Sequence, residues 1–521
     1  MKIVAALDIG SNSIHLAIAE IDAGGHLTLL DTHKEVVRLG RAIAQAADDS
    51  IDRVAMDLAI KTLATMKEIC AAYEATIRAV ATHATRAASN HEEFLAEIER
   101  VTGIHVEIID GDEEARLTFL GMRCGLPLDN QLVVGVDVGG GSTEIIIAKA
   151  NRIHFVTSLK VGAVTMTELY FQSGEFSAEG VQRLRAEVMM ALAPIVTEAR
   201  SHKFTLAVAS SGTAKALAAM TYMSQTNLQA SNINGFRFTE DDIDAIERRL
   251  VKLGTPVKIK NFYGVDTKRA DIILAGTCIL KTVGEMLGIH EWIASDYGLR
   301  EGLAMDTFSR QHVTAVNFSD IRWKSALACA RKYGVAKPSA RHVRRLAVAI
   351  YRQIEPRFFS GRDDDFREAN VQLLQTAAFL AEVGKYVSYS KRHTHSAYIL
   401  SEGSLLGYSQ EEKHLMSYIV RFSRKRIATV EEDARLESIR GNIERVNVLA
   451  ACLRCAAALN RTRRNHVKRV SFSFAGDSLA INVYYPIGAN VEAEQDALQK
   501  EGKSLGKVFG AIPMVSWLPL S

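Results

Sequence analysis

The first 307 residues alternate short apolar strands with helix-like segments. Residues 2–10 form an apolar run that ends in a glycine turn, and residues 15–21 follow as a second apolar strand, which predicts a hairpin. Residues 132–150 repeat this arrangement, with an apolar strand, an aspartate, a Gly/Ser turn and another apolar strand. The repeat predicts two related α/β lobes whose glycine turns face each other across a cleft.

The alternation continues around these hairpins. Residues 76–86 are strand-like and lead into a polar loop, and residues 105–111 form a short strand that runs into a helix. Residues 205–217 predict a strand, a tight turn and a helix, and residues 266–288 predict a helix. A strand, a turn and a closing helix are expected over residues 290–306.

The pattern changes after about residue 308. Residues 318–465 have helical periodicity, and from about residue 468 two apolar strands and a helix-like segment follow. Eight prolines and no low-complexity tract indicate packed domains rather than flexible linkers. The sequence therefore predicts an α/β protein of four domains: 1–128, lobe I; 129–307, lobe II; 308–467, a helical domain; and 468–521, a small α+β domain.

The net charge of +3 conceals an asymmetry along the chain. Residues 308–521 contain 33 Lys+Arg and 20 Asp+Glu, a balance of +13, which leaves −10 for residues 1–307. A basic half joined to an acidic half suggests that one part holds a polyanion that the other processes. Two differently charged solvated surfaces would give the same numbers.

The composition is that of a globular protein, with 48% hydrophobic and 24% charged residues. No apolar stretch approaches the roughly 18 residues that a membrane helix needs, and Asp8 interrupts the apolar start, so neither a span nor a signal peptide is expected. Six scattered cysteines favour a reducing, cytoplasmic location. Cys452 and Cys455 form a C-x-x-C within a helical run, which favours core packing over redox or metal chemistry.

The two glycine turns are the first candidate for chemistry. Each begins with an aspartate at a strand end, Asp8 and Asp137, and continues with glycine and short hydroxyl residues. Glycine lets the backbone N–H groups approach an anion closely, whereas the aspartate suits a divalent cation or a water molecule. One such turn is weak evidence, but two with the same pattern are much more specific.

At these turns the chain resembles a known family. The paired turns are similar to the phosphate loops of the actin-like, sugar kinase and Hsp70 superfamily, and within it to the exopolyphosphatase/guanosine pentaphosphatase family. Five more motifs run in that family's order: THATR at 82–86, GDEEAR at 111–116, SSGT at 210–213, SDYGLREG at 295–302 and HSAYIL at 395–400. The resemblance spans nearly the whole chain and is weakest after about residue 470. It implies two actin-like (ribonuclease H-like) ATPase-superfamily lobes, an all-α HD-like domain and a small α+β domain.

The resemblance also implies roles for individual residues. Glu114 is expected to be the catalytic base that accepts a proton from water, and Glu113 an acid at a helix start. Mg²⁺ or another divalent cation is expected on Asp8, Asp137 and Glu114, with Glu144 as a supporting acid. Phosphate is expected to contact these residues: Ser11, Asn12, Ser13, Arg86, Gly139, Gly140, Gly141, Ser142 and Thr143. Asp296, Arg300 and Glu301 are interpreted as structural or supporting residues as often as contacts.

The helical domain departs from a working HD site. The position of the paired histidine is Ala381, and Glu382 stands where the aspartate would be. Because alanine cannot bind a metal, no second metal centre is expected there. His393 and His395 are interpreted as structural residues, although contact with phosphate is an alternative.

Basic clusters punctuate the later half of the chain. A long polyphosphate could lie along them and gain from counterion release, although solvated helix faces would give the same pattern. Nucleic acid is a weaker interpretation, because aromatic residues are sparse among the clusters. The expected basic track comprises Arg424, Lys425, Arg426, Arg461, Arg463, Arg464, Lys468 and Arg469.

Several functions remain open from the sequence. The favoured one is an exopolyphosphatase that releases orthophosphate from inorganic polyphosphate, and removal of the 5′ γ-phosphate of guanosine pentaphosphate is the alternative or a second activity. A non-catalytic nucleotide-responsive protein and a sugar kinase are less favoured, since Glu114, Asp8 and Asp137 are intact and the EEAR motif suits hydrolysis. A homodimer is expected from the resemblance, and no membrane partner.

Overall fold

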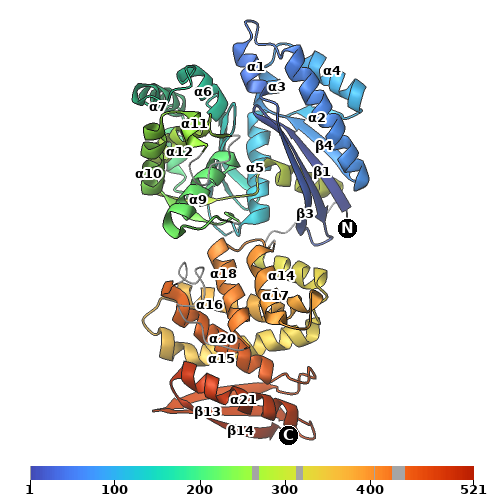
Figure 1. Ribbon diagram of the computed structural model, residues 1–521, viewed down its shortest axis with the longest axis vertical. Coiled ribbons are helices and arrows are strands. Elements are labelled where there is room, and N and C mark those ends of the chain that lie inside the picture. Colours follow the sequence, from blue (N-terminus) through green and yellow to red (C-terminus); the bar gives the residue numbers. More distant parts are fainter. Residues whose placement is uncertain are drawn as a thin grey trace. The chain divides into compact units, whose positions relative to one another are not determined.

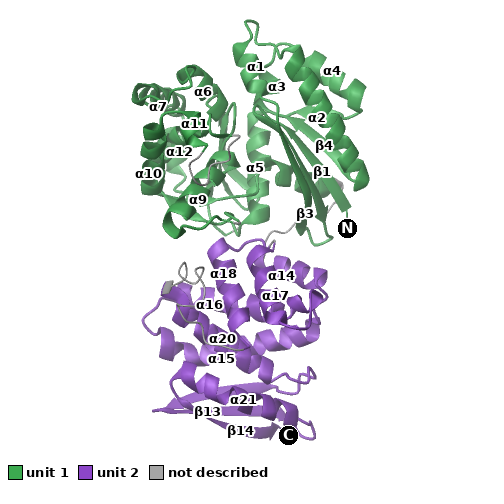
Figure 2. Ribbon diagram, in the orientation of Figure 1, with its two compact units in different colours: residues 1–321 green, residues 322–521 purple. Residues whose placement is uncertain are grey.

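Two mixed β-sheets of the same topology lie in residues 1–321, one of two units into which the chain divides (Figures 1 and 2). The computed structural model describes residues 2–128, 130–230, 232–260, 269–311, 321–403, 405–424 and 440–520. Unit 2 comprises residues 322–521. Among the described residues, no helix combines the length and the apolar character needed to cross a membrane.

The first sheet has the strand order β3-β2-β1-β4-β5, and the second has the equivalent order β8-β7-β6-β9-β11 with β10 added at its edge. In each sheet the first three strands pair antiparallel and the next two pairings are parallel. The duplication predicted from the paired hairpins is therefore present in the fold. The strands are β1 (Lys2–Ile9), β2 (Ser13–Ile21), β3 (Leu27–Val36), β4 (Thr76–Ala81), β5 (Val106–Ile108), β6 (Val133–Val138), β7 (Thr143–Lys149), β8 (Arg152–Leu159), β9 (Leu206–Ser210), β10 (Arg237–Thr239) and β11 (Glu291–Ala294).

Helices cover both sheets and connect their parallel strands (Figure 1). They are α1 (Leu39–Gln45), α2 (Arg53–Ala72), α3 (His83–Ala87), α4 (His91–Thr102), α5 (Gly111–Gly125), α6 (Ala163–Tyr170), α7 (Ala178–Leu192), α8 (Val196–Ser201), α9 (Ser211–Thr226), α10 (Glu240–Leu253), α11 (Pro256–Ile259), α12 (Ile273–Leu287) and α13 (Leu299–Gln311). Residues 76–86 were expected to be strand-like, but β4 ends at Ala81 and α3 follows, because two alanines favour the helical backbone there. Of the helix expected over 266–288, the part before residue 269 lies outside the described residues.

Two helices of unit 1 are exchanged between the halves of the sequence. Helix α5, from the first half, packs its apolar side chains Ala115, Phe119 and Met122 against the second sheet. Helix α13, from the end of the second half, packs against β1, β2 and α5. The division into four domains stays a prediction. Helices α5 and α13 each pack on the sheet of the other half, so their contacts cross the boundary predicted between residues 128 and 129.

Unit 2 begins with helices and ends with a small sheet. Its elements are α14 (Ile321–Lys332), α15 (Lys337–Phe359), α16 (Asp364–Leu380), the 3₁₀ turn η2 (Val383–Tyr386), α17 (Arg392–Glu402), α18 (Gln410–Phe422), the 3₁₀ turn η4 (Arg440–Asn442), α20 (Ile443–Ala458), β12 (Arg469–Ala475), β13 (Ser478–Pro486), α21 (Glu492–Phe509) and β14 (Ile512–Leu520). One hydrophobic core joins the helices to the sheet, with Ile350 and Leu449 in the same cluster as Phe472 and Ile481. The sheet and the helices are therefore stabilised together.

The sequence predicted two strands after residue 468, whereas the structure has three. Strand β14 was missed because Pro513 and Pro519 interrupt its apolar run. The N–H of Ile512 donates to the Asp477 carbonyl, so alternate residues direct their N–H groups toward β13. The prolines occupy the other positions, at the free edge of the sheet, where a missing N–H costs no ladder hydrogen bond.

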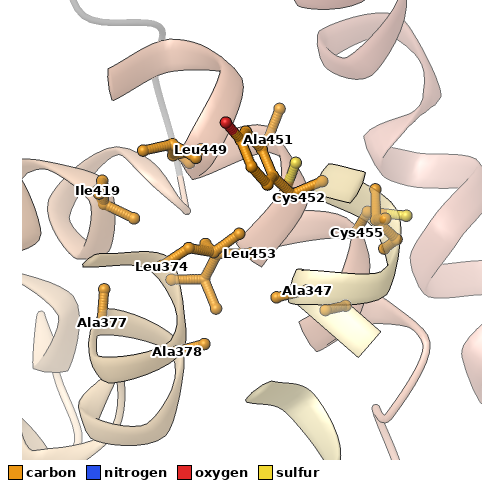
Figure 3. Packing of buried hydrophobic residues seen from close by; sticks show 14 of the residues in the cluster. Ala347, Leu374, Ala377, Ala378, Ile419, Leu449, Ala451, Cys452, Leu453 and Cys455 are labelled. Carbon is orange, nitrogen blue, oxygen red and sulfur yellow. The ribbon is translucent and has the colours of Figure 1, made fainter. Parts of the chain in front are cut away.

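The C-x-x-C of α20 belongs to the core of unit 2. Figure 3 shows Cys452 and Cys455 among Ala347, Leu374 and Leu453. Both cysteines are free and fully buried, and burial raises the pKa of the Cys455 thiol to about 12. The prediction of core packing rather than redox or metal chemistry is confirmed.

Candidate functional site

The two glycine turns have the same backbone geometry. The N–H of Gly10 donates to the Ser13 carbonyl at 3.2 Å, and the N–H of Gly139 donates to the Ser142 carbonyl at 2.9 Å. Each turn joins the two antiparallel strands of a hairpin, and an aspartate stands at the end of the first strand in each. The sequence repeat is therefore also a repeat of local structure.

The two turns lie directly against each other. A Cβ on Gly140 would be 3.1 Å from the Cβ of Ser11, and a Cβ on Gly141 would be 2.7 Å from the Ser11 Oγ. His83, from the THATR motif, packs on the same glycine, since that Cβ would lie 2.3 Å from the imidazole Cδ2. Glycine at 140 and 141 thus permits a close approach that no larger residue would allow.

The carbonyl groups of the turns are occupied by neighbouring helices. Val37 and Arg38 donate their N–H groups to Asn12, and Gly40 donates to Ser11. On the other turn, Ala163 donates to Gly139, while Val164 and Thr165 donate to Gly140. Within the described part of the chain, the N–H groups of Ser11, Asn12, Gly140 and Gly141 have no hydrogen-bond acceptor. The turns thus present four available N–H donors, while the carbonyls of Ser11, Asn12, Gly139 and Gly140 already accept hydrogen bonds, which suits an anion.

The side-chain hydroxyls of Ser13, Ser142 and Thr143 have structural partners. Thr143 is fully buried and its hydroxyl donates to the Val161 carbonyl at 2.5 Å. Ser142 hydrogen-bonds Glu144, and Ser13 is buried and accepts from the Asn12 amide at 3.2 Å. Of the residues expected to contact phosphate, the turns therefore offer backbone N–H groups more than hydroxyls.

Glu114 lies in the first turn of α5, where Asp110 caps the helix by accepting the N–H of Glu113 at 2.8 Å. Burial raises the pKa of Glu114 well above its usual range, and the nearby carboxylates of Glu144 and Asp8 add to this. Its Oε2 is buried and accepts no hydrogen bond from any described residue. The Glu114 carboxylate therefore lies near the acids of both hairpins, whereas its neighbour Glu113 pairs with Arg116 at 2.6 Å.

The three other acids of this cluster are also buried. Burial raises the pKa of Asp8 to about 7, with Arg300 opposing and Asp137 and Glu301 adding to the shift. Burial, followed by Asp137, raises the pKa of Glu144 to about 7, although Ser142 and Ser158 donate hydrogen bonds to it. The pKa of Asp137 is raised by burial, against the hydroxyls of Ser210 and Ser211. Because these carboxylates lie close together, it costs free energy for all of them to be ionised at the same time.

Arg86 is the cation nearest to Glu114, with 3.7 Å between its Nη1 and Oε2. The same Nη1 donates to the Ile109 carbonyl, which fixes the guanidinium over the start of α5. Burial, Arg86 and Lys160 lower the pKa of His83 to about 4, so this imidazole is neutral at pH 7. The THATR motif contained His83, but sequence reasoning singled out only Arg86.

A divalent cation fits two features of this cluster. Asp8 Oδ1 and Glu114 Oε2 are both buried without a hydrogen-bond donor among the described residues. Hard oxygen donors of this kind suit Mg²⁺, which takes one or two carboxylates and completes its shell with water and phosphate oxygens. No group of three or more His, Cys, Asp or Glu in the described ranges forms a metal site by itself.

The basic track expected in unit 2 stays a prediction, and its described residues lie in different surroundings. Arg424, Arg461 and Arg463 line a cavity of about 1040 Å³, whereas Arg464 and Lys468 are exposed outside it. Arg469 lies over the Tyr484 ring at 4.1 Å. Lys425 and Arg426 lie outside the described residues.

Two α/β halves of one topology, which meet at paired anion-binding turns beside a carboxylate cluster, have the architecture of a phosphate-handling enzyme. Comparison with known families agrees. The sequence model of the Ppx/GppA phosphatase family matches residues 17–311, and that of Ppx/GppA phosphatase, domain III, matches residues 321–501. The chain belongs to this family and is a hydrolase that acts on phosphoanhydrides.

Two curated relatives carry the name guanosine-5′-triphosphate,3′-diphosphate pyrophosphatase. The protein of Aeromonas hydrophila is 27% identical over 486 residues, which cover 93% of this chain and 92% of the relative. The protein of Vibrio vulnificus is 27% identical over 482 residues, which cover 92% and 91%.

Two solved structures resemble this chain over about three fifths of its length. A Ppx/GppA family member from Aquifex aeolicus is 28% identical with a TM-score of 0.51, covering 60% of this chain and 99% of its own. An exopolyphosphatase from Cytophaga hutchinsonii is 24% identical with a TM-score of 0.55, covering 61% and 100%, and it shows likeness of fold alone.

Proposed function

We propose that this protein is an exopolyphosphatase, which hydrolyses the terminal phosphoanhydride of inorganic polyphosphate and releases orthophosphate. The observation that carries the proposal is the position of Glu114, whose buried Oε2 accepts no hydrogen bond from a described residue and whose carboxylate lies near the acids of both glycine hairpins. A water molecule beside this oxygen would be close to a phosphate held by the turns.

The terminal phosphate binds to the N–H groups of Ser11, Asn12, Gly140 and Gly141, which have no protein acceptor among the described residues. Donors fixed in the backbone stabilise the charge that develops on the equatorial oxygens in the transition state. Mg²⁺, bound near Asp8 and Asp137, would neutralise part of the phosphate charge.

Glu114 accepts the proton of the attacking water. Its raised pKa makes it a stronger base than an exposed glutamate, and the Arg86 guanidinium at 3.7 Å keeps part of the population ionised. Arg86 thus positions the base. Because Glu114 is the partner of Arg86, this role needs no direct contact between Arg86 and phosphate.

Guanosine pentaphosphate is the second candidate substrate. The full-length relatives from Aeromonas hydrophila and Vibrio vulnificus carry the name of that activity. Removal of its 5′ γ-phosphate is the same reaction at a terminal phosphoanhydride, so the same residues would serve both substrates. A homodimer remains part of the proposal, and light scattering of the purified chain tests it.

The test compares two adjacent glutamates of α5. Glu114→Gln keeps the shape of the side chain and removes the base, so kcat should fall by about 10²- to 10⁴-fold. Glu113→Gln is the matched control, because Glu113 pairs with Arg116 and should affect stability more than turnover. If Glu114→Gln retains phosphate release comparable to Glu113→Gln, the assignment of the base is wrong.

The substrate is decided by the same assay. Values of kcat/KM for long-chain polyphosphate and for guanosine pentaphosphate, each with Mg²⁺, rank the two candidates. A kcat/KM at least tenfold higher for guanosine pentaphosphate would make the nucleotide the substrate and remove polyphosphate hydrolysis as the main activity.

A further inference from the structure

Unit 2 contains a cavity of about 1040 Å³, which is large enough for a small organic ligand. Its walls are formed by the start of α15, the ends of α16, α18 and α20, and part of α21. It includes Ala381 and Glu382, the positions at which an HD site would have its histidine and aspartate. The cavity thus includes the two positions at which the resemblance would place an HD metal pair.

Three arginines gather on one wall of this cavity: Arg392, Arg424 and Arg461. Burial lowers the pKa of Arg424, and the positive charges of Arg392 and Arg461 lower it further, whereas Glu382 opposes the shift, so both other arginines act on Arg424. An anion between them would relieve this repulsion and accept charge-assisted hydrogen bonds.

Two acids of the cavity have cation partners, and Glu382 lies 3.8 Å from Arg392 of the cluster itself. Glu382 pairs with Arg463 at 3.1 Å and with Lys385 at 2.5 Å. Glu501 lies 3.5 Å from Arg454. The described lining contains six Arg and Lys side chains and three Asp and Glu side chains, so it carries an excess of positive charge.

Arg454 has a structural task and is not part of the arginine cluster. Its Nε donates to the Ser423 carbonyl at 3.2 Å and its Nη2 to the Phe422 carbonyl at 2.7 Å, which closes the end of α18. Comparable carbonyl partners are absent among the described contacts of Arg424 and Arg461. These two arginines therefore have capacity for a ligand that Arg454 lacks.

The remaining lining is largely apolar. Val343, Phe379 and Leu453 face the cavity, and the Tyr389 ring lies against Arg392 with 4.5 Å between the ring centre and the guanidinium carbon. An inorganic phosphate chain would make no favourable contact with such a surface, whereas an organic group attached to phosphate would.

We propose that this cavity binds a nucleoside polyphosphate, with its phosphates on Arg392, Arg424 and Arg461 and its base and sugar on the apolar wall. The site is separate from the carboxylate cluster of unit 1 and does not depend on the role of Glu114. It assigns Arg424 and Arg461, which are both exposed, to this cavity rather than to an open track.

Titration calorimetry of the full chain tests this site, with Glu114→Gln as background so that no ligand is hydrolysed. GDP is the probe, and pyrophosphate and guanosine separate the contributions of phosphate and nucleoside. We expect Arg424→Gln and Arg461→Gln each to weaken the binding of GDP by at least about tenfold. Arg341→Gln, an exposed residue of α15 outside the cavity, is the matched control and should leave it unchanged.

Two outcomes would overturn the inference. Unchanged affinity for GDP in both arginine variants would exclude the site, and pyrophosphate that binds as tightly as GDP would remove the nucleoside from the assignment. Photolabelling with 8-azido-GDP gives an independent readout. Label on peptides from residues 335–343 or 378–393 supports the site, and label confined to unit 1 refutes it.

Discussion

Gly302 of α13 lies against the main-chain carbonyl of Leu117 in α5, so closely that a Cβ at residue 302 would come within 1.8 Å of that oxygen. Gly121 of α5 meets the carbonyl of Gly298 in the same way, at 1.9 Å. The two exchanged helices are therefore packed at a separation that only glycine allows. Because α5 carries Glu114 in its first turn, this contact positions the proposed base.

Gly302→Ala is expected to destabilise unit 1 and to lower kcat, because the new methyl group would push α5 away from α13. Overpacking of this kind typically costs about 1–3 kcal/mol. Thermal unfolding and initial rates of phosphate release measure the two effects. Gly361→Ala is the control, since nothing lies within 4 Å of its Cβ position. Equal stability and activity in both variants would show that the contact does not position Glu114.

This contact also explains a motif that the sequence left unexplained. SDYGLREG was matched to the family only as a string, and its charged residues drew attention, whereas its Gly302, together with Gly121 of α5, makes the helix crossing possible. No local pattern reveals such a role, because the partner of Gly302 lies nearly two hundred residues away along the chain. The exchange of α5 and α13 is invisible to periodicity for the same reason.

Local sequence patterns were more informative where the residues concerned are close together in the sequence. The Asp–Gly hairpins at Asp8 and Asp137 were predicted from strand and turn patterns, and the matching sheet topologies confirm the duplication. The hydroxyl of Thr143 was expected to contact phosphate because of its place in the motif. It donates instead to the carbonyl of Val161, in the segment that follows β8. Residue type indicated a hydroxyl, but tertiary contacts determined its partner.

The stability of the metal-free protein should depend on pH through Asp8 and Glu144. Their pKa values in the folded protein are about 7, above the usual range, so the folded state binds their protons more tightly than the unfolded state does. Their contribution to stability is therefore present at low pH and is lost as pH rises toward and through about 7. Each group can change the unfolding free energy by at most about 1.4 kcal/mol per pH unit.

Asp8→Asn isolates this effect, because asparagine keeps the shape and cannot ionise. In buffers with a chelator, the variant should gain stability relative to the parent between pH 5 and pH 8, as measured by urea denaturation. Asp365→Asn, an exposed acid of unit 2, is the comparison and should give a constant difference. A constant difference for Asp8→Asn as well would mean that Asp8 titrates normally.

Chelation of divalent cations should abolish phosphate release, and added Mg²⁺ should restore it. Since the acids must lose their protons to bind a cation, the concentration of Mg²⁺ for half-maximal activity should fall as pH rises from 6 to 8. Asp8→Asn should raise that concentration by at least about tenfold, because Asp8 Oδ1 is buried and accepts no hydrogen bond from a described residue. Full activity in excess chelator would refute the proposed requirement.

Long and short substrates should respond differently to the exposed basic residues of unit 2. Arg464 and Lys468 lie outside the cavity and are free to follow a polyanion along the surface. Reversing both charges, Arg464→Glu with Lys468→Glu, should lower kcat/KM for long-chain polyphosphate by about tenfold or more and weaken its dependence on salt. Tripolyphosphate is too short to reach beyond the proposed active site and should be hydrolysed as before.

The pair Lys503→Glu with Lys507→Glu, on the exposed side of α21, changes the net charge equally and controls for a general electrostatic effect. If both double variants lose the same factor, or if tripolyphosphate loses as much as the long chain, net charge rather than a track explains the preference.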